Sequence, residues 1–336
     1  MTNFIDLESK YQINVYPKRD LVLISGKNAR VWDEQGKEYI DCVAGHGVAN
    51  LGHGNEKIIA AIQEQAQKII TCSNLFYNDT RALLLEKLVK IAPKNLNKAF
   101  LCNSGTESIE AAIKFTRYST RKTEFICAMR GFHGRTLGSL SATFNPKYRD
   151  DFKPLLPGFN FVPFNNFEKL KEKINKNTAG ILLEIVQGEG GVNIGKEEYF
   201  LKVRELCDKK GIFLIVDEVQ SGFCRTGKIF ACNYFNLEPD LLCLAKSMAG
   251  GLPMGAVLCS DKIELEVGKH GSTFGGNPLS CAAAIAAIDY MLQHKLEQQA
   301  KEKGEYFISQ FKRHNLGKVR EIRNLGLMIG IELKEE

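Results

Sequence analysis

The sequence lacks any apolar stretch long enough to cross a membrane. Its longest uninterrupted apolar run, residues 281–288, is far shorter than a spanning helix. It also lacks blocks of like charge, because a formal net charge of +6 is spread along 336 residues. Nucleic acid and membrane surfaces are therefore poor candidates as partners. The acidic first residues carry no secretory signal, so we expect a soluble protein that is not secreted.

Cysteine pairs and histidine pairs are missing as well. The ten cysteines are scattered singly without a CxxC motif, and the six histidines form neither an HxxxH nor an HxH pair. A disulfide framework and a protein-built metal site are both disfavoured by these patterns. Several cysteines lie in apolar, strand-like runs, where they serve as small core residues. We expect reduced thiols in a cytoplasmic protein that holds no metal.

What the sequence does contain is a regular alternation of short apolar runs with helical patterns. Such alternation is typical of an α/β protein with a mostly parallel central sheet covered by helices on both faces. The length allows one large α/β unit and a smaller α+β unit, which we divide as 1–54, 55–290 and 291–336, with the two ends forming the smaller domain. The expected strands are 98–102, 124–128, 180–184, 211–216, 241–245 and 255–259.

Polar or ionisable side chains follow five of these runs. In open α/β sheets ligands bind outside the carboxyl ends of the strands. Five such endings at one edge predict a binding site rather than solvated loops. The residues are Asn103, Arg130 with His133, Glu184 with Gln187, Asp217, and Lys246.

Two glycine-rich stretches imitate nucleotide-binding motifs. Residues 222–228 fit the phosphate-loop pattern GxxxxGK, but Ile229 stands where a Mg²⁺-binding Ser or Thr belongs. Residues 188–195 approach GxGxxG, but the third glycine comes two positions late and the stretch is not in the first strand–helix turn. A nucleoside triphosphatase and a dinucleotide-binding fold are therefore weaker interpretations.

Lys246 ends an apolar strand with no acidic neighbour in sequence, where an ammonium is costly to bury. By itself it could be a surface lysine that extends to water. Desolvation would instead favour a neutral amine able to form a Schiff base, which suggests pyridoxal phosphate. That cofactor needs a carboxylate at its ring nitrogen, which Asp217 could supply, and helix-start N–H groups at its phosphate, which 104–107 could supply. Phe132 could cover the ring, and Arg135 could bind a substrate carboxylate.

Several stretches together closely resemble class III, ornithine-type aminotransferases. The resemblance runs from about residue 16 to the end of the chain, and within the family it is closest to the branch acting on acetylornithine. It implies a pyridoxal-phosphate-dependent transferase of fold type I. The motifs are NSGTE at 103–107, FHGRT at 132–136, QGEGG at 187–191, DEVQ at 217–220, AK at 245–246 and STFGGNP at 272–278, with VWD at 31–33, YID at 39–41 and LGH at 51–53.

The resemblance also implies a role for each matching residue. Lys246 would be the Schiff-base lysine and the proton carrier, and Arg135, Glu189 and Ser272 would bind substrate. Glu189 would be the switch residue that lets one pocket accept two substrates. Thr273 would reach the phosphate held by a partner subunit, which implies a homodimer with shared active sites. The cofactor-binding residues would be Gly105, Thr106, Phe132, Asp217, Val219, Gln220, Lys246 and Thr273.

The implied reaction is a ping-pong transamination. N2-acetyl-L-ornithine and 2-oxoglutarate would give N-acetyl-L-glutamate 5-semialdehyde and L-glutamate, a step of arginine biosynthesis, with succinyl-diaminopimelate as a possible second substrate. Ornithine or 4-aminobutyrate is the alternative, since His46 stands where relatives specific for acetylornithine carry an aliphatic residue. Family members continue past Glu336 to a second arginine that pairs with the residue matching Glu189. A shortened relative with impaired catalysis, kept for binding, is the remaining alternative.

Overall fold

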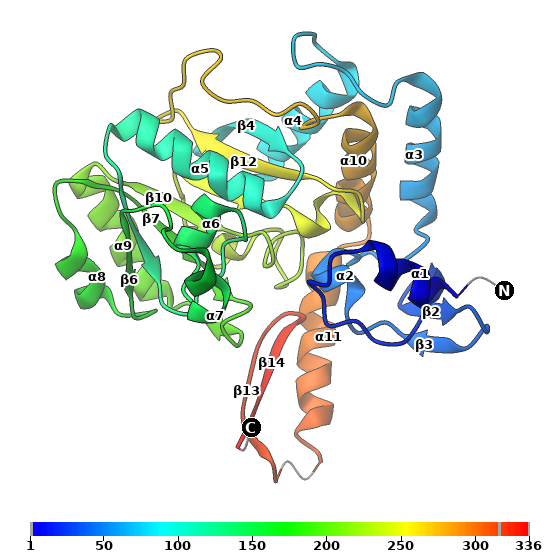
Figure 1. The fold of residues 1–336 in the computed structure, drawn as a ribbon. Helices are drawn as coiled ribbons and strands as arrows, with labels where there is room; N and C mark the ends of the chain where they lie inside the picture. The colour runs from blue at the N-terminus through cyan, green and yellow to red at the C-terminus, as the bar shows by residue number, and fades with distance from the viewer. Residues whose placement is uncertain (1–2, 315–316, 335–336) are drawn as a thin grey trace.

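A seven-stranded sheet forms the centre of the molecule. The structure, a computed structural model, describes residues 3–314 and 317–334 (Figure 1). Six strands of this sheet run parallel and β12 alone runs antiparallel to its two neighbours, so the expected mostly parallel α/β sheet is confirmed. In spatial order the strands are β4 (Leu96–Cys102), β12 (Gly255–Ser260), β11 (Leu241–Leu244), β10 (Phe213–Asp217), β7 (Thr178–Glu184), β5 (Glu124–Ala128) and β6 (Phe159–Val162).

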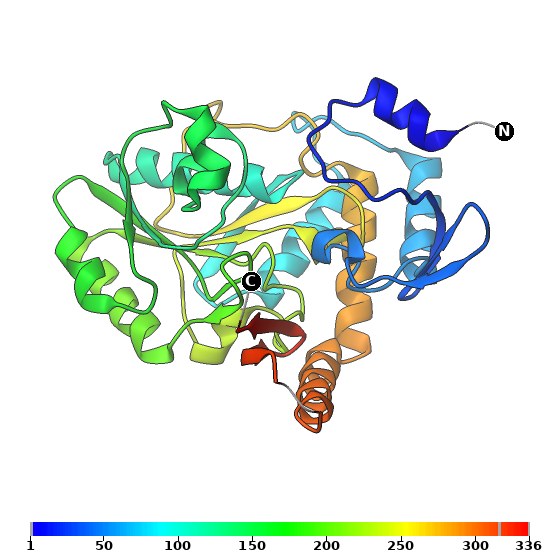
Figure 2. The same cartoon turned by 60° about the horizontal axis from the view of Figure 1, so that its bottom comes forward.

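Alternate residues of these strands enter two different cores. In β11, Leu241 and Cys243 pack with the cluster under α5, whereas Leu242 and Leu244 pack with the cluster on the opposite face. Both faces are therefore covered by helices, which is why the strands read as continuous apolar runs (Figure 2). The helices are α3 (Glu56–Lys68), α4 (Asp79–Ile91), α5 (Gly105–Thr120), α6 (Leu137–Ala142), α7 (Pro146–Arg149), α8 (Phe167–Lys173), α9 (Glu197–Lys210) and α10 (Pro278–Gln293), with 3₁₀ turns η1 (Asp150–Phe152), η2 (Ala231–Phe235) and η3 (Lys246–Ala249).

The two ends of the chain carry their own small sheets. The N-terminal sheet and the C-terminal hairpin are separate, and α11 continues from the end of α10 and runs beside the hairpin (Figure 1). The division into 1–54, 55–290 and 291–336 stays a prediction. These elements are α1 (Phe4–Tyr11), β1 (Leu23–Lys27), β2 (Arg30–Asp33), β3 (Glu38–Ile40), α2 (Ala44–Gly47), α11 (Leu296–Phe311), β13 (Val319–Leu325) and β14 (Met328–Leu333); a short ladder, β8 (Val186–Gln187) with β9 (Asn193–Ile194), follows β7.

Cysteines behave as the sequence predicts. All ten are free, and eight of them are buried in the core. Across the described residues no helix is both long and apolar enough to cross a bilayer. The same part of the chain holds no cluster of three metal-ligating side chains of the His, Cys, Asp or Glu type.

Candidate active site

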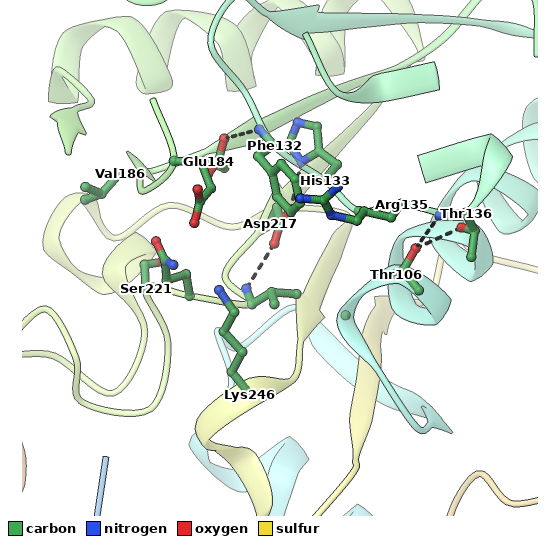
Figure 3. A pocket seen from close by; sticks show the side chains of 15 residues that line it. Thr106, Phe132, His133, Arg135, Thr136, Glu184, Val186, Asp217, Ser221 and Lys246 are labelled. Atoms are coloured by element: carbon green, nitrogen blue, oxygen red, sulfur yellow. Dashed lines mark hydrogen bonds and ion pairs between the residues drawn. The ribbon is translucent and has the colours of Figure 1, made fainter. Parts of the chain in front are cut away.

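A cavity of about 430 Å³ opens at the carboxyl edge of the parallel strands. Its walls come from the start of α5 and from the segments that follow β5, β7, β10 and β11 (Figure 3). Segments far apart in sequence therefore meet at the place the strand-end pattern predicts. Of the eleven site residues named from the sequence, nine line it: Gly105, Thr106, Phe132, Arg135, Glu189, Asp217, Val219, Gln220 and Lys246.

Lys246 directs its amine into this cavity (Figure 3). It follows the last residues of β11 and adopts φ 42°, a left-handed conformation that costs a non-glycine residue on the order of 1 kcal/mol. Burial lowers the pKa of the Lys246 ammonium, and the nearby charges of Asp217, Glu189 and Glu184 only partly oppose this effect. The half-buried side chain is thus biased toward the neutral, nucleophilic amine that the sequence analysis expected.

Asp217 lies at the end of β10, the strand that pairs directly with β11. It is 6% exposed, and its carboxylate accepts hydrogen bonds from the His133 ring Nδ1 at 2.8 Å and the Val219 backbone N–H at 3.0 Å. Burial lowers the pKa of His133, but the hydrogen bond and charge of Asp217 outweigh burial and raise it overall. His133 and Asp217 thus form a buried, hydrogen-bonded pair at the cavity wall.

Glu184, at the end of β7, is a buried carboxyl group that the sequence analysis named as a strand ending without giving it a role. Its two oxygens accept from the backbone N–H groups of Phe132 at 3.2 Å and Gly188 at 3.4 Å. Burial, with a further contribution from the charge of Asp217, raises the pKa of Glu184 to about 8. The charge of His133 works against this increase. Near neutral pH this side chain therefore holds a proton at the cavity wall.

Stability is expected to fall as pH rises from about 4.5 to about 8. Over that window the folded chain keeps a proton on Glu184 that the unfolded chain releases, so raising the pH favours unfolding. His133, whose folded pKa is also raised, contributes in the same direction above pH 6.5. The Glu184→Gln variant, which stays neutral, should lose less stability between pH 6 and pH 8 than the wild type in urea unfolding. Equal losses in the two proteins would contradict the assignment.

The start of α5 forms the side of the cavity that suits an anion. The Ser104 hydroxyl accepts from the Glu107 N–H at 3.3 Å, as a helix cap should. The Glu107 carboxylate accepts from the Ser104 hydroxyl and from the Asn103 N–H, but not from the Ser104 N–H, so the expected capping box is incomplete. Within the described residues the N–H groups of Gly105 and Thr106 donate to no protein acceptor. Gly105 cannot carry a side chain, because a Cβ would lie 2.7 Å from Val219 Cγ1. Two free donors and a positive helix end thus face the cavity.

Arg135 provides the exposed cation of the cavity. Its guanidinium lies 4.5 Å from the ring centre of Tyr148 and 5.8 Å from that of Phe132. The two rings meet edge to face at 5.7 Å, so they hold the arginine beside the opening. A guanidinium in this setting can bind a carboxylate in a bidentate manner.

Other residues named from the sequence lie outside the cavity. The Ser272 hydroxyl accepts from Asn103 Nδ2 at 3.2 Å and from the Gly275 N–H at 3.0 Å, which makes it part of a turn. Thr273 is exposed and does not line the cavity of its own chain, and its role at a partner's site stays a prediction. Gln187 turns into the protein and donates to the Met129 carbonyl at 2.8 Å. His46 is exposed on α2.

The two glycine-rich stretches do not build nucleotide sites. After the 222–228 loop the chain enters the short 3₁₀ turn η2 rather than an α-helix, and Lys228 is exposed. After 188–191 it enters β9 rather than a helix. The helix after the second stretch, α9, begins only at Glu197, beyond the last of these glycines, so neither glycine-rich loop opens a helix as a phosphate loop or a dinucleotide fingerprint requires.

Comparisons with known proteins agree with this geometry. Residues 14–336 match the sequence model of the family aminotransferase class III. Acetylornithine aminotransferase of Methanopyrus kandleri is 46% identical over 98% of this chain and 85% of the relative. The [LysW]-aminoadipate semialdehyde transaminase of Deinococcus radiodurans is 45% identical over 100% of this chain and 79% of the relative. An ornithine aminotransferase structure from Toxoplasma gondii, with partial occupancy of pyridoxal phosphate at its active site, aligns with a TM-score of 0.93 and 33% identity over 98% of this chain and 81% of that one.

Proposed function

We propose that this chain, which belongs to the class III aminotransferase family, transfers an amino group from N2-acetyl-L-ornithine to 2-oxoglutarate with the help of pyridoxal phosphate. The observation that carries the proposal is the pairing of β10 with β11, which sets the Asp217 carboxylate and the Lys246 amine in one cavity. An amine of lowered pKa and a buried carboxylate are the two groups that this cofactor requires.

The residues present fit the cofactor. The free N–H groups of Gly105 and Thr106 suit a phosphate, and the absence of room for a Cβ at Gly105 fits a close approach by backbone. Asp217, a buried carboxyl group hydrogen-bonded to His133, suits a protonated ring nitrogen. The remaining residues that would hold the cofactor are Phe132 and Val219 at the ring, Gln220 at its phenolic oxygen, Lys246 at its aldehyde carbon and Thr273 of a second copy at its phosphate.

Pyridoxal phosphate, when bound, supplies an electron sink for the carbon that bears the transferred nitrogen. The side chains supply the rest of the chemistry. The Lys246 amine would take the proton from that carbon and return it elsewhere, for which a lowered pKa is an advantage. Asp217 would hold the proton on the ring nitrogen, and Arg135 would orient the donor through its carboxylate.

The choice of substrate rests on the relatives. Names that specify acetylornithine occur among relatives about 45% identical to this chain, and succinyl-diaminopimelate offers the same acyl-amino-acid outline. Glu189 at the rim of the cavity would act as the switch residue between donor and acceptor. Ornithine or 4-aminobutyrate as donor is the alternative, supported by the structural likeness to ornithine aminotransferase.

A homodimer in the cytoplasm belongs to the same proposal. Leu75, Phe76 and Tyr77 form a strongly exposed apolar segment, with exposures of 88, 68 and 107%, and Phe274 beside Thr273 is exposed at 64%. Exposed apolar residues grouped in this way favour contact with another protein surface. The ten free cysteines fit a reducing compartment.

The test is an absorption spectrum of the purified protein with pyridoxal phosphate, before and after N2-acetyl-L-ornithine, combined with an assay for glutamate formed from 2-oxoglutarate. We expect a visible cofactor band that the donor removes and 2-oxoglutarate restores. If the band responds to ornithine or 4-aminobutyrate but not to acetylornithine, the responding compound is the amino donor instead of acetylornithine. A folded protein that binds no cofactor would refute the proposal.

A further inference from the structure

The C-terminal hairpin β13–β14 contacts the glycine-rich loop 188–191, which carries Glu189 at the active-site cavity. Arg323 of β13 donates twice to the Gly191 carbonyl, from Nε at 3.0 Å and from Nη2 at 2.9 Å. We propose that Arg323 is a positioning residue for Glu189, which holds this loop by its main chain and so fixes where the Glu189 carboxylate lies. The inference rests on the proposed function, because the role of Glu189 as switch residue belongs to it.

The loop cannot fix Glu189 without support from other parts of the chain. Three of its four residues are glycine, which loses more conformational freedom on ordering than any other residue. The Glu189 side chain is exposed at the cavity, and its carboxylate makes no hydrogen bond or ion pair with any residue that the structure describes. The position of this carboxylate therefore depends on how firmly the main chain of the loop is held.

Close packing explains why the loop consists of glycines. A Cβ at Gly188 would lie 1.4 Å from Gln220 Oε1, and a Cβ at Gly190 would lie 2.8 Å from the Arg130 carbonyl oxygen. Gly191 has φ 103°, a conformation that other residues rarely adopt. The loop thus lies between the segments that follow β5 and β10, where a side chain has no room. The pattern that imitates a dinucleotide fingerprint reflects this packing.

Arg323 is itself held by two carboxylates of the hairpin. Its Nη1 donates to Glu332 at 2.7 Å and also to Glu321, and its side chain is only 17% exposed. The donors on Nε and Nη2 remain, and both of them are directed to the Gly191 carbonyl. A guanidinium is a planar, charged donor, so its orientation by the carboxylates also fixes the carbonyl that it binds.

The contact between Arg323 and Gly191 belongs to a packed interface. Gly330 is opposite Arg323 in the hairpin ladder, and a Cβ at Gly330 would lie 3.0 Å from the Gly191 carbonyl oxygen and 2.9 Å from Val192 Cβ. β13 also packs against β9, the strand that follows the loop. The hairpin and the loop therefore approach each other main chain to main chain, which is a closer contact than an exposed arginine alone would give.

Arg323 adds a charged donor to local contacts of the loop. The Gly188 N–H donates to Glu184 Oε1 at 3.4 Å, and the Asn193 side chain donates to the Gly190 carbonyl at 2.9 Å. These two partners lie within four residues of the groups they bind, whereas Arg323 is 132 residues away from its partner in sequence. Loss of the arginine should therefore leave the loop folded but widen the range of positions open to its carboxylate.

The kinetic test uses the pyridoxal-phosphate-loaded enzyme with N2-acetyl-L-ornithine and 2-oxoglutarate. Arg323→Gln should lower kcat/KM for at least one of these substrates by about tenfold, the size of one charge-assisted hydrogen bond. In the Glu189→Gln background the same substitution should change kcat/KM by less than about twofold, because the group that it positions is already gone. The matched control is Arg320→Gln on the same strand, where the arginine is 71% exposed and paired with Glu332 at 3.2 Å; it should retain the wild-type values.

Hydrogen exchange of the loaded enzyme without substrate gives a readout that needs no turnover. Amides of residues 188–191 should exchange about tenfold faster in Arg323→Gln than in the wild type or in Arg320→Gln, while the amides of β7 keep their rates. If acetylornithine is converted, the proposed function stands, and the inference is wrong if either the coupled kinetic loss or the faster exchange is missing. If acetylornithine is not converted, the proposed function fails, and the exchange rates alone decide whether Arg323 holds the loop.

Discussion

Replacing Lys246 by alanine is expected to lower the transamination rate by at least about 10³-fold, because the same amine is assigned both to the cofactor and to the proton transfer. The variant should also lack the visible band that depends on this lysine, even when pyridoxal phosphate is added in excess. Stability should change little or rise, since the substitution removes a half-buried amine whose charged form is disfavoured by burial, and few packing contacts are lost. Rate, spectrum and urea unfolding would be measured on the same preparation.

The chain offers a matched control for that experiment. Lys228 is an exposed lysine at the end of the loop that imitates a phosphate-binding motif, and its ammonium lies 6.0 Å from the ring centre of Tyr234. Lys228→Ala should retain wild-type rate and spectrum. A Lys246→Ala protein with more than about a tenth of the wild-type rate would show that the reacting amine is elsewhere.

Removal of the Asp217 carboxylate is expected to damage both activity and stability. Asp217→Ala leaves His133, 3% exposed, without its ion-pair partner, and breaking a buried pair in this way costs about 3–5 kcal/mol. The rate should fall by at least about 10²-fold, because no group would then hold a proton on the ring nitrogen. Urea unfolding and steady-state kinetics measure the two effects separately.

A double substitution separates these effects. Adding His133→Ala to Asp217→Ala removes the uncompensated buried group, so part of the lost unfolding free energy should return. The rate should not return with it, since the carboxylate is still missing. If stability and rate recovered together, Asp217 would be a structural residue and the cofactor assignment would lose its central support.

The strand ends were predictable from the sequence because buried parallel strands are apolar on both faces. A single ionisable residue after such a run, like Lys246 after 241–245, stands out against it. The direction of β12 was not predictable, since an apolar run carries no sign of its orientation. The sequence did not predict β6 (Phe159–Val162). This edge strand is only half buried, and Asn160 interrupts its apolar run, so it lacks the pattern of a buried strand.

The sequence alone could not decide which of two adjacent acidic residues enters the cavity. Asp217 and Glu218 are neighbours in sequence, but only Asp217 enters the cavity. Glu218 points into the protein and accepts hydrogen bonds from the N–H groups of Ala231 and Cys232 at the start of η2. The partnership of His133 with Asp217 is equally invisible in sequence, because 84 residues separate them and only the order of the strands brings them together. The motif resemblance named Asp217 correctly as a cavity residue but gave no role to His133 or Glu184.

The order of strands in the large sheet has a consequence for how the protein is made. β4 precedes the other strands of that sheet in the chain, yet its ladder partner is β12, about 150 residues later. Contacts so distant in sequence form slowly, because the entropy of closing the intervening loop must be overcome first. During synthesis, β4 and the start of α5 must wait until residue 260 has left the ribosome. Until then β4 has no strand partner and its apolar side chains are exposed. Such exposure promotes aggregation, so we expect the growing chain to bind chaperones.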